Sequence, residues 1–385
     1  MVKNHPLQEV HRPDFESGDG PLTVVDLFSG CGGLSLGAAQ AANARGLAVN
    51  IPLAVDFDDA PIAVLKANFP DAGAEVGLVE SYFNGVEGSA PTPEERSIKD
   101  RCENVDLLIG GPPCQGHSNL NNHTRRNDPK NRLYFRMARA AEVLRPRVVI
   151  IENVPAVVHD SQRVVDRTTA HLRKAGYVVS ASRVEFTLLG IPQMRKRHAL
   201  IAIRADCATQ ESLPDDLLKF RPLPARDLRW AIGDLAGIAS DLWVDCPSKM
   251  SSENRRRIQW LIDNDELNLP NHLRPACHQG DHSYVSMYGR LAWHRPAQTI
   301  TSGFGSLGQG RYGHPSEPRT LTPHEAARIQ GFPDYFKFDA SPTRSKLATI
   351  IGNAVPPALT HLLTAELIDR GIVGEMAGAQ VEESA

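Results

Sequence analysis

The amino-acid sequence predicts an α/β fold, a doubly wound Rossmann-like parallel sheet that carries a smaller, irregular inserted domain. Strand-like and helix-like segments alternate over about the first 200 residues, which is the pattern of a parallel sheet with helices on both faces. A glycine-rich turn at 29–33 follows the first strand-like segment. The alternation fails from about residue 206 to 290, where prolines, three tryptophans and mixed charges occur. The inserted domain is expected there.

The individual elements follow from the spacing of apolar residues and from turn signals. Strands are expected over residues 22–28, 51–55, 105–109, 148–151, 177–186 and 198–203. Helices are expected from the glycine turn to about residue 44, and over 59–68, 133–144, 322–330 and 358–368. The segment at 322 begins Thr-Pro-His-Glu, which puts proline at the first helical position, where its missing N–H is no loss.

Composition places the chain among soluble globular proteins. It has 385 residues, of which 41% are hydrophobic and 23% charged, and no apolar run approaches the roughly 20 residues that span a membrane. The N-terminus lacks a signal-peptide core. Six cysteines are scattered without metal-ligand spacing, which indicates free thiols in a reducing cytoplasm and no metal site.

Net charge does not decide the partner. The formal charge is −3, so any attraction to nucleic acid must be local. Basic clusters occur at Arg125–Arg126, Arg195–Lys196–Arg197 and Arg255–Arg256–Arg257. Each alone is more often a solvated face than a phosphate site.

The segment Gly110-Gly111-Pro112-Pro113-Cys114-Gln115-Gly116 sets one cysteine in a rigid turn directly after a strand-like apolar run. The prolines fix φ and the glycines allow close approach of a ligand. The carboxyl end of a buried strand is where open α/β folds place their chemistry. Cys114 is therefore the candidate nucleophile.

Two features near the N-terminus favour an adenosine-containing cofactor without a pyrophosphate. The turn within 26–33 would follow a strand and open a helix, where amides point at a ligand. The next strand ends at Asp56-Phe57-Asp58, where a carboxylate can accept ribose hydroxyls and an aromatic ring can cover adenine. The plain structural alternative is an acidic helix cap, which suits Asp58. The spacing is not that of a dinucleotide or phosphate-loop motif.

Glu152 would end the strand next to that of Cys114. Burial penalises a charged carboxylate, so a glutamate there can give or share a proton in catalysis. The alternative is a structural carboxylate that pairs with an arginine.

Several motifs occur in the order of the DNA cytosine-5 methyltransferases. They are the segment 26–33, Pro112-Pro113-Cys114-Gln115, Glu152-Asn153-Val154, Gln193-Met194-Arg195-Lys196-Arg197, the segments 295–301 and 321–333, and Gly352-Asn353-Ala354-Val355-Pro356-Pro357. The chain resembles this family, in its prokaryotic or phage form, from about residue 22 to 372. The resemblance implies a methyltransferase that uses S-adenosylmethionine and flips its target cytosine out of the duplex.

The resemblance also implies catalytic roles. The Cys114 thiolate would add to cytosine carbon 6, and carbon 5 would then take the methyl group. Glu152 would contact ring nitrogen 3 and the exocyclic amine. Arg197 would donate to the cytosine oxygen, and Arg195 would support the pocket.

The cofactor positions carry over in the same way. Phe28 and Phe57 would flank the adenine and Asp56 would take the ribose hydroxyls, where the family often has glutamate. The other implied contacts are Gly30, Gly32, Glu80 for the adenine amine, Pro112, and Asn353 from the C-terminal segment.

The implied DNA contacts lie in two places. The loop from Ser118 to Arg132, rich in Asn, Arg and His, would close on DNA as a lid. Gln115 and His117 would lie near the flipped base, with His117 where an aromatic residue is commoner. The contacts implied or suggested by charge are Gln115, His117, Ser118, Arg125, Arg126, Arg255, Arg256 and Arg257.

The resulting domain plan has an N-terminal extension at 1–21 and a target-recognition domain at 206–290. The catalytic domain would comprise 22–205 and 291–372, and 373–385 would be a flexible tail. Expected partners are double-stranded DNA and a cognate restriction endonuclease or other defence protein. No membrane is expected, and the chain would be a cytoplasmic monomer.

Two further readings of the same motifs are weaker. A tRNA cytosine-5 methyltransferase would carry a Cys-Phe-Thr signature in the recognition region, which this chain lacks. A catalytically silent regulatory homologue would typically lack the cysteine or the glutamate, and both are present here.

Overall fold

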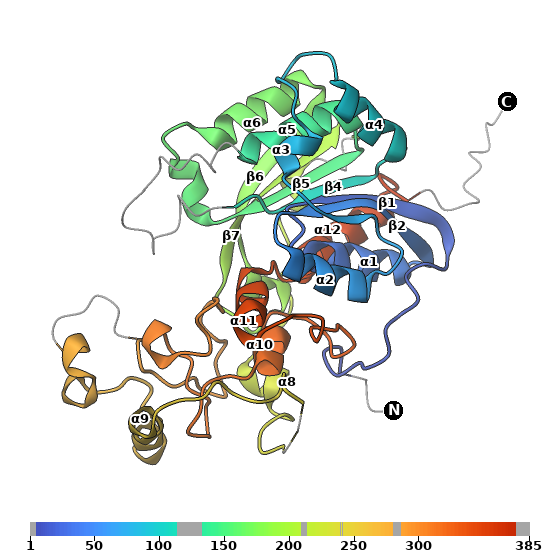
Figure 1. Cartoon of the computed structure of the whole chain (residues 1–385). Coiled ribbons are helices and arrows are strands. Elements are labelled where there is room, and N and C mark those ends of the chain that lie inside the picture. Colours follow the sequence, from blue (N-terminus) through green and yellow to red (C-terminus); the bar gives the residue numbers. More distant parts are fainter. Residues whose placement is uncertain are drawn as a thin grey trace. The chain divides into compact units, whose positions relative to one another are not determined.

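A computed structural model describes residues 5–113, 133–208, 214–238, 240, 242–279 and 286–374. The chain folds as two compact units (Figure 1). The sheet unit comprises Arg12–Glu185, Lys196–Arg221 and Val355–Ala385. The irregular unit comprises Met1–His11, Phe186–Arg195 and Pro222–Ala354. Of the segment 206–290, in which the sequence predicts the inserted domain, residues 222–290 lie in the irregular unit and residues 206–221 in the sheet unit.

The sheet unit is built on a seven-stranded sheet in the order β3-β2-β1-β4-β5-β7-β6. The strands are β1 Asp19–Leu27, β2 Leu47–Asp56, β3 Ala74–Val76, β4 Leu107–Gly110, β5 Val148–Asn153, β6 Tyr177–Glu185 and β7 Lys196–Arg204. The pairs from β3 to β5 are parallel, whereas β7 runs antiparallel to both β5 and β6. The predicted α/β fold is confirmed, but the sheet is mixed rather than wholly parallel. The ten residues between β6 and β7 are too few for a parallel crossover.

Helices cover both faces of this sheet, α3–α6 on one and α1, α2 and α12 on the other (Figure 1). Their bounds are α1 Gly33–Asn43, α2 Asp59–Asn68, α3 Val79–Tyr82, α4 Pro93–Arg101, α5 Leu133–Leu144, α6 Val164–Lys174, α7 Pro214–Leu217 and α12 Ala358–Asp369. Alternate strand residues explain the two layers. Val149 and Ile151 of β5 join the core formed with α5 and α6, while the intervening side chains face the opposite layer.

The C-terminal helix α12 completes the sheet unit by packing on α1. The hydroxyl of Thr360 donates to the carbonyl of Leu34 at 2.7 Å. A Cβ atom added to Gly37 would lie 2.0 Å from the carbonyl oxygen of Pro357, so the two helices approach as closely as only glycine allows. The expected helix at 358–368 is confirmed by α12.

The irregular unit contains the helices α8 Leu228–Ile232, α9 Ser252–Asp263, α10 Pro323–Ile329 and α11 Arg344–Asn353, with long loops between them. Helix α10 begins where the sequence predicts, with a capping box between Thr322 and Glu325 and proline at its first turn. A small core of Ile258, Leu261 and Tyr288 holds the part around α9. Among the helices of the described segments, none combines the length and apolar character that a bilayer crossing requires.

Candidate active site

Glu152 lies at the carboxyl end of β5, and Arg197 lies at the start of the neighbouring β7. The strands are antiparallel and Glu152 is opposite Ala199, so Arg197, two residues away, points to the same side of the sheet. The Nε atom of Arg197 lies 2.7 Å from Oε1 of Glu152, and the glutamate is 6% exposed. The strand register therefore produces a largely buried carboxylate–guanidinium pair. A glutamate paired with an arginine is the structural role that the sequence left open for Glu152.

The chain that leads toward Cys114 passes directly beside this pair. The side-chain amide of Asn153 donates to the carbonyl of Pro112 at 3.1 Å. A Cβ atom added to Gly111 would lie 3.4 Å from Oε2 of Glu152, so the backbone runs close to the carboxylate. The structure thus brings Pro112 and Glu152 together.

Residues 114–132 lie outside the described residues. The predictions for Cys114, Gln115, His117, Ser118, Arg125 and Arg126, and for the loop that was expected to act as a lid, fall within this stretch.

The glycine turn joins β1 to α1 in left-handed backbone conformations. The φ angles are 59° at Phe28, 53° at Gly30 and 85° at Gly32. The amide of Ser29 donates to the carbonyl of Val55 at 3.0 Å, and that of Gly30 donates to Oδ2 of Asp56 at 2.9 Å. The turn is thus fixed to the end of β2, and Gly30 has open space where a Cβ atom would be.

Two carboxylates stand at this turn. Asp56 also accepts from the amide of Asp58 at 3.1 Å, and desolvation by burial raises its pKa. Asp58 caps α2 by accepting from Ala60, the capping role considered for it from the sequence. Asp26 is fully buried, and the hydroxyl of Ser35 donates to its Oδ2 at 2.6 Å. Its Oδ1 accepts no hydrogen bond from the described residues, and burial raises its pKa to about 7.

This arrangement fits a cationic nucleoside such as S-adenosylmethionine. A buried carboxyl with an unused oxygen can accept a donor or balance a positive charge, and ionising Asp26 alone is penalised by its surroundings. Sequence reasoning quoted Asp26 within the motif but did not assign it to the site. Its signal is the burial of an acidic residue inside an otherwise apolar strand.

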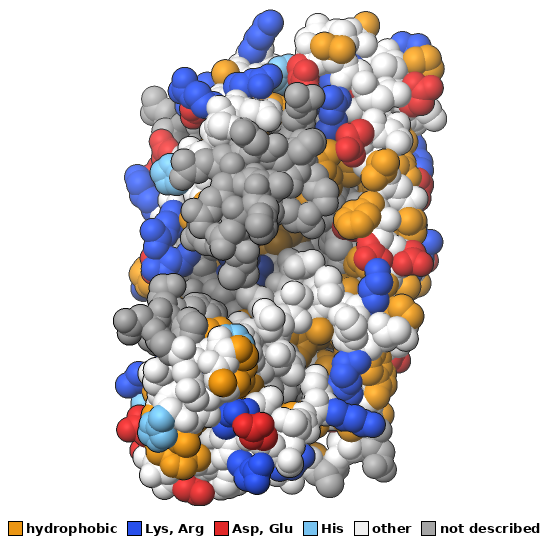
Figure 2. All heavy atoms as spheres, turned by 60° about the vertical axis from the view of Figure 1, so that its left-hand side comes forward, with side chains coloured by type: hydrophobic (Ala, Val, Ile, Leu, Met, Phe, Trp, Pro, Cys, Tyr) orange, Lys and Arg blue, Asp and Glu red, His pale blue; other side chains and the backbone are white. Residues whose placement is uncertain are grey.

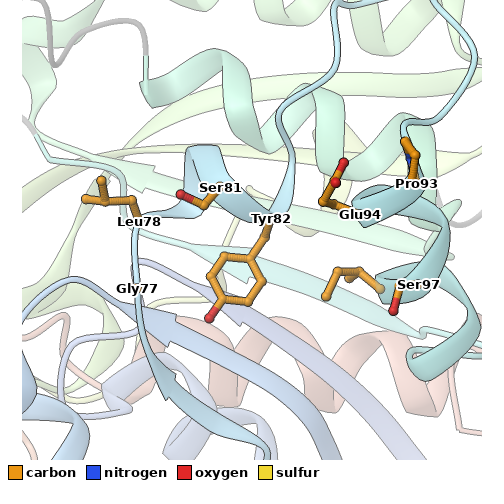
Figure 3. A pocket seen from close by; sticks show the side chains of 8 residues that line it. Gly77, Leu78, Ser81, Tyr82, Pro93, Glu94 and Ser97 are labelled. Atoms are coloured by element: carbon orange, nitrogen blue, oxygen red, sulfur yellow. The ribbon is translucent and has the colours of Figure 1, made fainter.

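Phe57 and Glu80 follow the ends of two neighbouring strands, Phe57 directly after β2 and Glu80 four residues after β3. Phe57 is 66% exposed, and Glu80 is on the short helix α3. An open pocket of about 550 Å³ lies between α3 and α4 and is lined by Leu78, Tyr82 and Pro93 among others (Figure 3). None of the predicted site residues that the structure describes lines this pocket. The strand ends are therefore the better candidate site.

Arg195 lies in the irregular unit, within a network of buried amides. It is 2% exposed and its Nη1 donates to the carbonyl of Ile300 at 3.2 Å. The side chain of Gln193 accepts from the amide of Ile300 and donates to Oε1 of Gln330, both at 2.8 Å. Gln330 in turn donates to the carbonyl of Ile351 at 2.6 Å. Three motif segments that are far apart in sequence are thereby held together.

Sequence reasoning missed Gln193 and Gln330 as organising residues, although both stand in quoted motifs. Their signal is an uncharged polar side chain in a segment that also carries buried apolar residues. Asn353 is exposed at the end of α11. The preceding Gly352 packs on Thr301 and Ser302 so closely that an added Cβ atom would lie 2.2 Å from the amide nitrogen of Ser302.

The three arginines of α9 are not equivalent. Arg255 and Arg256 are exposed. Arg257 turns inward: its Nε donates to the carbonyl of Leu273 at 2.9 Å and its Nη1 donates to Asn254 at 2.7 Å. Its guanidinium also lies 5.8 Å from the ring centre of Tyr288. Arg257 therefore braces the small core around α9.

A family comparison decides what kind of enzyme carries this site. Residues 22–369 match the family described as C-5 cytosine-specific DNA methylase. The chain belongs to this family. It is a DNA (cytosine-5)-methyltransferase, as the motif order predicted.

Individual relatives of this methylase cover nearly its whole length. Type II methyltransferase M1.BsuMI of Bacillus subtilis is 43% identical over 358 residues, which cover 93% of this chain and 83% of the relative. Type II methylase M.HgiDII of Herpetosiphon aurantiacus is 30% identical and covers 91% of this chain and 96% of its own length. The crystal structure of S. pombe Dnmt2 methyltransferase, at 18% identity, aligns with a TM-score of 0.61 over 91% of this chain and 98% of its own. That structural likeness shows the methyltransferase fold alone.

Proposed function

We propose that this methylase modifies a specific cytosine in double-stranded DNA by covalent catalysis at Cys114. The supporting observation is the buried Glu152–Arg197 pair at the sheet edge, which adjoins the backbone of Gly111 and Pro112 two residues before the cysteine. Two charged groups held this way can recognise one polar ring edge. The target base must leave the duplex to reach them.

The reaction begins with a nucleophile because cytosine carbon 5 is a poor nucleophile until carbon 6 has been attacked. The Cys114 thiolate forms a bond from Sγ to carbon 6, and the ring electrons move toward carbon 5. Carbon 5 then takes the methyl group. A base then takes the carbon 5 proton, and the electron pair of that C–H bond re-forms the double bond between carbons 5 and 6. The bond from Sγ to carbon 6 breaks at the same time, and its electron pair leaves with the Cys114 sulfur as thiolate.

Glu152 and Arg197 would orient and stabilise the base during this sequence. Glu152 would contact ring nitrogen 3 and the exocyclic amine, where charge changes when carbon 6 is attacked. Arg197 would move part of its interaction from Glu152 to the cytosine oxygen. Because both side chains are largely buried, each contact acts in a medium of low dielectric constant. Arg195 would support this pocket, as the family motif implies.

S-adenosylmethionine, as the methyl donor, supplies an electrophilic methyl group on a positively charged sulfur. Phe28 and Phe57 would hold the adenine, and Asp56 would accept the ribose hydroxyls. Gly30 and Gly32 would leave room for the cofactor, as the open space at Gly30 supports. Glu80, Pro112 and Asn353 are the further proposed contacts. Asp26 would balance positive charge at the turn.

The irregular unit is proposed to recognise the DNA target. Figure 2 shows one face of the molecule, on which Lys and Arg side chains line the upper left-hand margin, in the part that belongs to the sheet unit, and fewer lie in the lower part. Such local attraction suits a protein whose net charge is −3. On α9, Arg255 and Arg256 are the proposed phosphate contacts, and Arg257 is proposed to act through the fold of the helix. The relatives' names as Type II methyltransferases favour a role as a modification enzyme beside a restriction endonuclease. That the chain acts as a monomer remains a proposal from the sequence alone.

Bisulfite sequencing tests this function. The chain would be expressed in a host that lacks other cytosine methylation, and the genome would be sequenced after conversion. The expected result is protection of one cytosine within one recurring sequence, and no protection with Cys114→Ala. An unprotected genome, with folded wild-type protein present in the cells, would refute the proposal.

A further inference from the structure

A segment ahead of the first strand packs into the sheet unit, although it lies before the residues that match the family. The ring of Phe15 is 1% exposed and stacks on the ring of Phe69, with the ring centres 5.8 Å apart and the planes 22° apart. The amide of Val49 in β2 donates to the carbonyl of Phe15 at 2.7 Å. A nearby glycine, Gly18, approaches β2 so closely that an added Cβ atom would lie 2.5 Å from the amide nitrogen of Ala48. The segment is therefore closely built into the sheet unit.

Arg12 strengthens the same contact. Its guanidinium carbon lies 4.7 Å from the ring centre of Phe15 and 5.7 Å from that of Phe69. Its Nε donates at 2.8 Å to the carbonyl of Asn68, the last residue of α2. A cation at the carboxyl end of a helix is favourable, and one on an aromatic face adds attraction. Arg12 and Phe15 together hold the end of α2.

Phe69 also lies next to the glycine turn. A Cβ atom added to Gly32 would lie 3.2 Å from Cγ of Leu65 and 3.8 Å from Cε2 of Phe69. Gly32 is the N-cap of α1, with φ of 85°, and its amide donates to the carbonyl of Ser29 at 2.9 Å. The side chains at the end of α2 thus lie directly beside this left-handed turn.

We propose that Phe15 is a positioning residue for the cofactor turn 29–33, acting through Phe69. The inference rests on the proposed binding of S-adenosylmethionine at that turn. The stacked ring of Phe15, with Arg12 on its face, keeps Phe69 in place next to Gly32. A turn with several positive φ angles persists only where its surroundings hold it. Removing the ring gives Phe69 room to retreat, so the turn samples conformations that do not accept the nucleoside.

Calorimetric titration with S-adenosylhomocysteine tests this role without relying on turnover. Phe15→Ala removes the stack, Phe15→Leu keeps the site filled in case the alanine variant folds poorly, and Leu172→Ala is the control. Leu172 is fully buried in α6 of the same unit but belongs to the opposite layer from α1 and α2. Circular dichroism would confirm that each protein is folded at the titration temperature.

We expect Phe15→Ala to weaken binding of S-adenosylhomocysteine about tenfold and Phe15→Leu about threefold. A tenfold loss of affinity corresponds to only a small change in the free energy of binding. Leu172→Ala should stay within about twofold of the wild type. In assays, the KM for the methyl donor should rise while kcat at saturating donor stays near the wild-type value. Wild-type affinity in both folded Phe15 variants would overturn the inference alone. A wild-type protein that bound no S-adenosylhomocysteine would overturn the proposed cofactor site with it.

Discussion

The sheet unit and the irregular unit hold their functional residues by different means. In the sheet unit, strand register puts Glu152 beside Arg197, and strand pairing brings the glycine turn to the end of β2, where the Asp56 side chain accepts from Gly30. In the irregular unit, buried side chains hold loop segments together, as Gln193 and Gln330 do. The difference teaches that substitutions at the sheet edge should affect chemistry more than stability. Substitutions in the irregular unit should affect stability first.

A second network in the irregular unit shows the same dependence on side chains. His324 in α10 contacts Asp245 through Nδ1 at 2.7 Å and Asp334 through Nε2 at 2.8 Å. Arg328 binds both Asp334 and Asp234, with its closest contacts at 2.6 and 2.7 Å. These charges join α10 to two loops that have little regular structure of their own.

The largest expected effect is at Glu152. Glu152→Gln removes the carboxylate that would face the base, and turnover should fall about 10²- to 10⁴-fold, as for other lost acid–base groups. The substitution also leaves the largely buried guanidinium of Arg197 without its carboxylate, so the unfolding temperature should fall too, although the loss of turnover is the larger effect. Single-turnover methyl transfer to DNA measures the effect, with Glu185→Gln, a partly exposed glutamate at the end of β6, as the control. A rate near that of the wild type would place the proton transfer elsewhere.

The next effect is on stability in the irregular unit. Gln193→Ala removes the donor to Oε1 of Gln330 and the acceptor for the amide of Ile300, which should cost about 1–3 kcal/mol. All four tryptophans, at positions 230, 243, 260 and 293, lie in this unit, so their fluorescence reports its unfolding. Gln259→Ala, an exposed glutamine on α9, is the control. Equal stability of the two variants would contradict the contrast between the units.

The two units should also differ in how stability depends on pH. Burial raises the pKa of Asp26 from 3.8 to about 7, so its contribution is greatest below pH 3.8 and is lost as pH rises toward 7. Burial alone would lower the pKa of His324, but the hydrogen bonds that its ring donates to Asp334 and Asp245 raise the pKa above 6.5. Its contribution is therefore present below pH 6.5 and is lost as pH rises through the raised value.

Unfolding curves measured at a series of pH values can separate the pH range in which Asp26 affects stability from that of His324. Asp26→Asn should flatten the stability of the sheet unit between pH 4 and 7, and His324→Gln should flatten tryptophan-monitored unfolding above pH 6.5. Unchanged pH profiles in both variants would show that neither group is linked to folding.

The smallest effect concerns DNA contacts on α9. Arg255→Ala and Arg256→Ala should each lower the slope of log Kd against log salt concentration by about 1, the change expected for one lost phosphate contact. Arg257→Ala should leave the slope unchanged and lower the unfolding temperature, because its donors serve Leu273 and Asn254. Fluorescence anisotropy with a DNA duplex gives the slopes. Equal slopes for all three variants and the wild type would remove α9 from the DNA-binding surface.

Much of the sheet unit could be predicted from the sequence because strands and turns there follow local patterns. Helices α2 and α5 begin and end at the predicted residues. Helix α4 could not be found by periodicity, since Glu95 is its one buried residue. A capping box and an ion pair between Glu95 and the buried Arg139, 2.5 Å apart, hold it instead.

The site was predictable to a similar degree. Glu152, Arg197 and Asp56 could be chosen because motif order and strand ends placed them. The inward turn of Arg257 could not be predicted, since a run of three arginines does not show which one faces the protein. The roles of Gln193 and Gln330 depend on contacts between segments more than 100 residues apart in sequence, as their separation of 137 shows. Such contacts leave no periodic signal.

The central claim is that Cys114 attacks carbon 6 of a flipped cytosine. The most direct test is to incubate the wild-type protein and its methyl donor with a duplex that carries 5-fluorocytosine at the target position. Fluorine at carbon 5 cannot leave as a proton does, so the bond from Sγ to carbon 6 should persist. The account predicts a denaturation-resistant complex whose peptide cross-link maps to Cys114 and which Cys114→Ala does not form. Full activity on ordinary DNA without any trapped complex would contradict it.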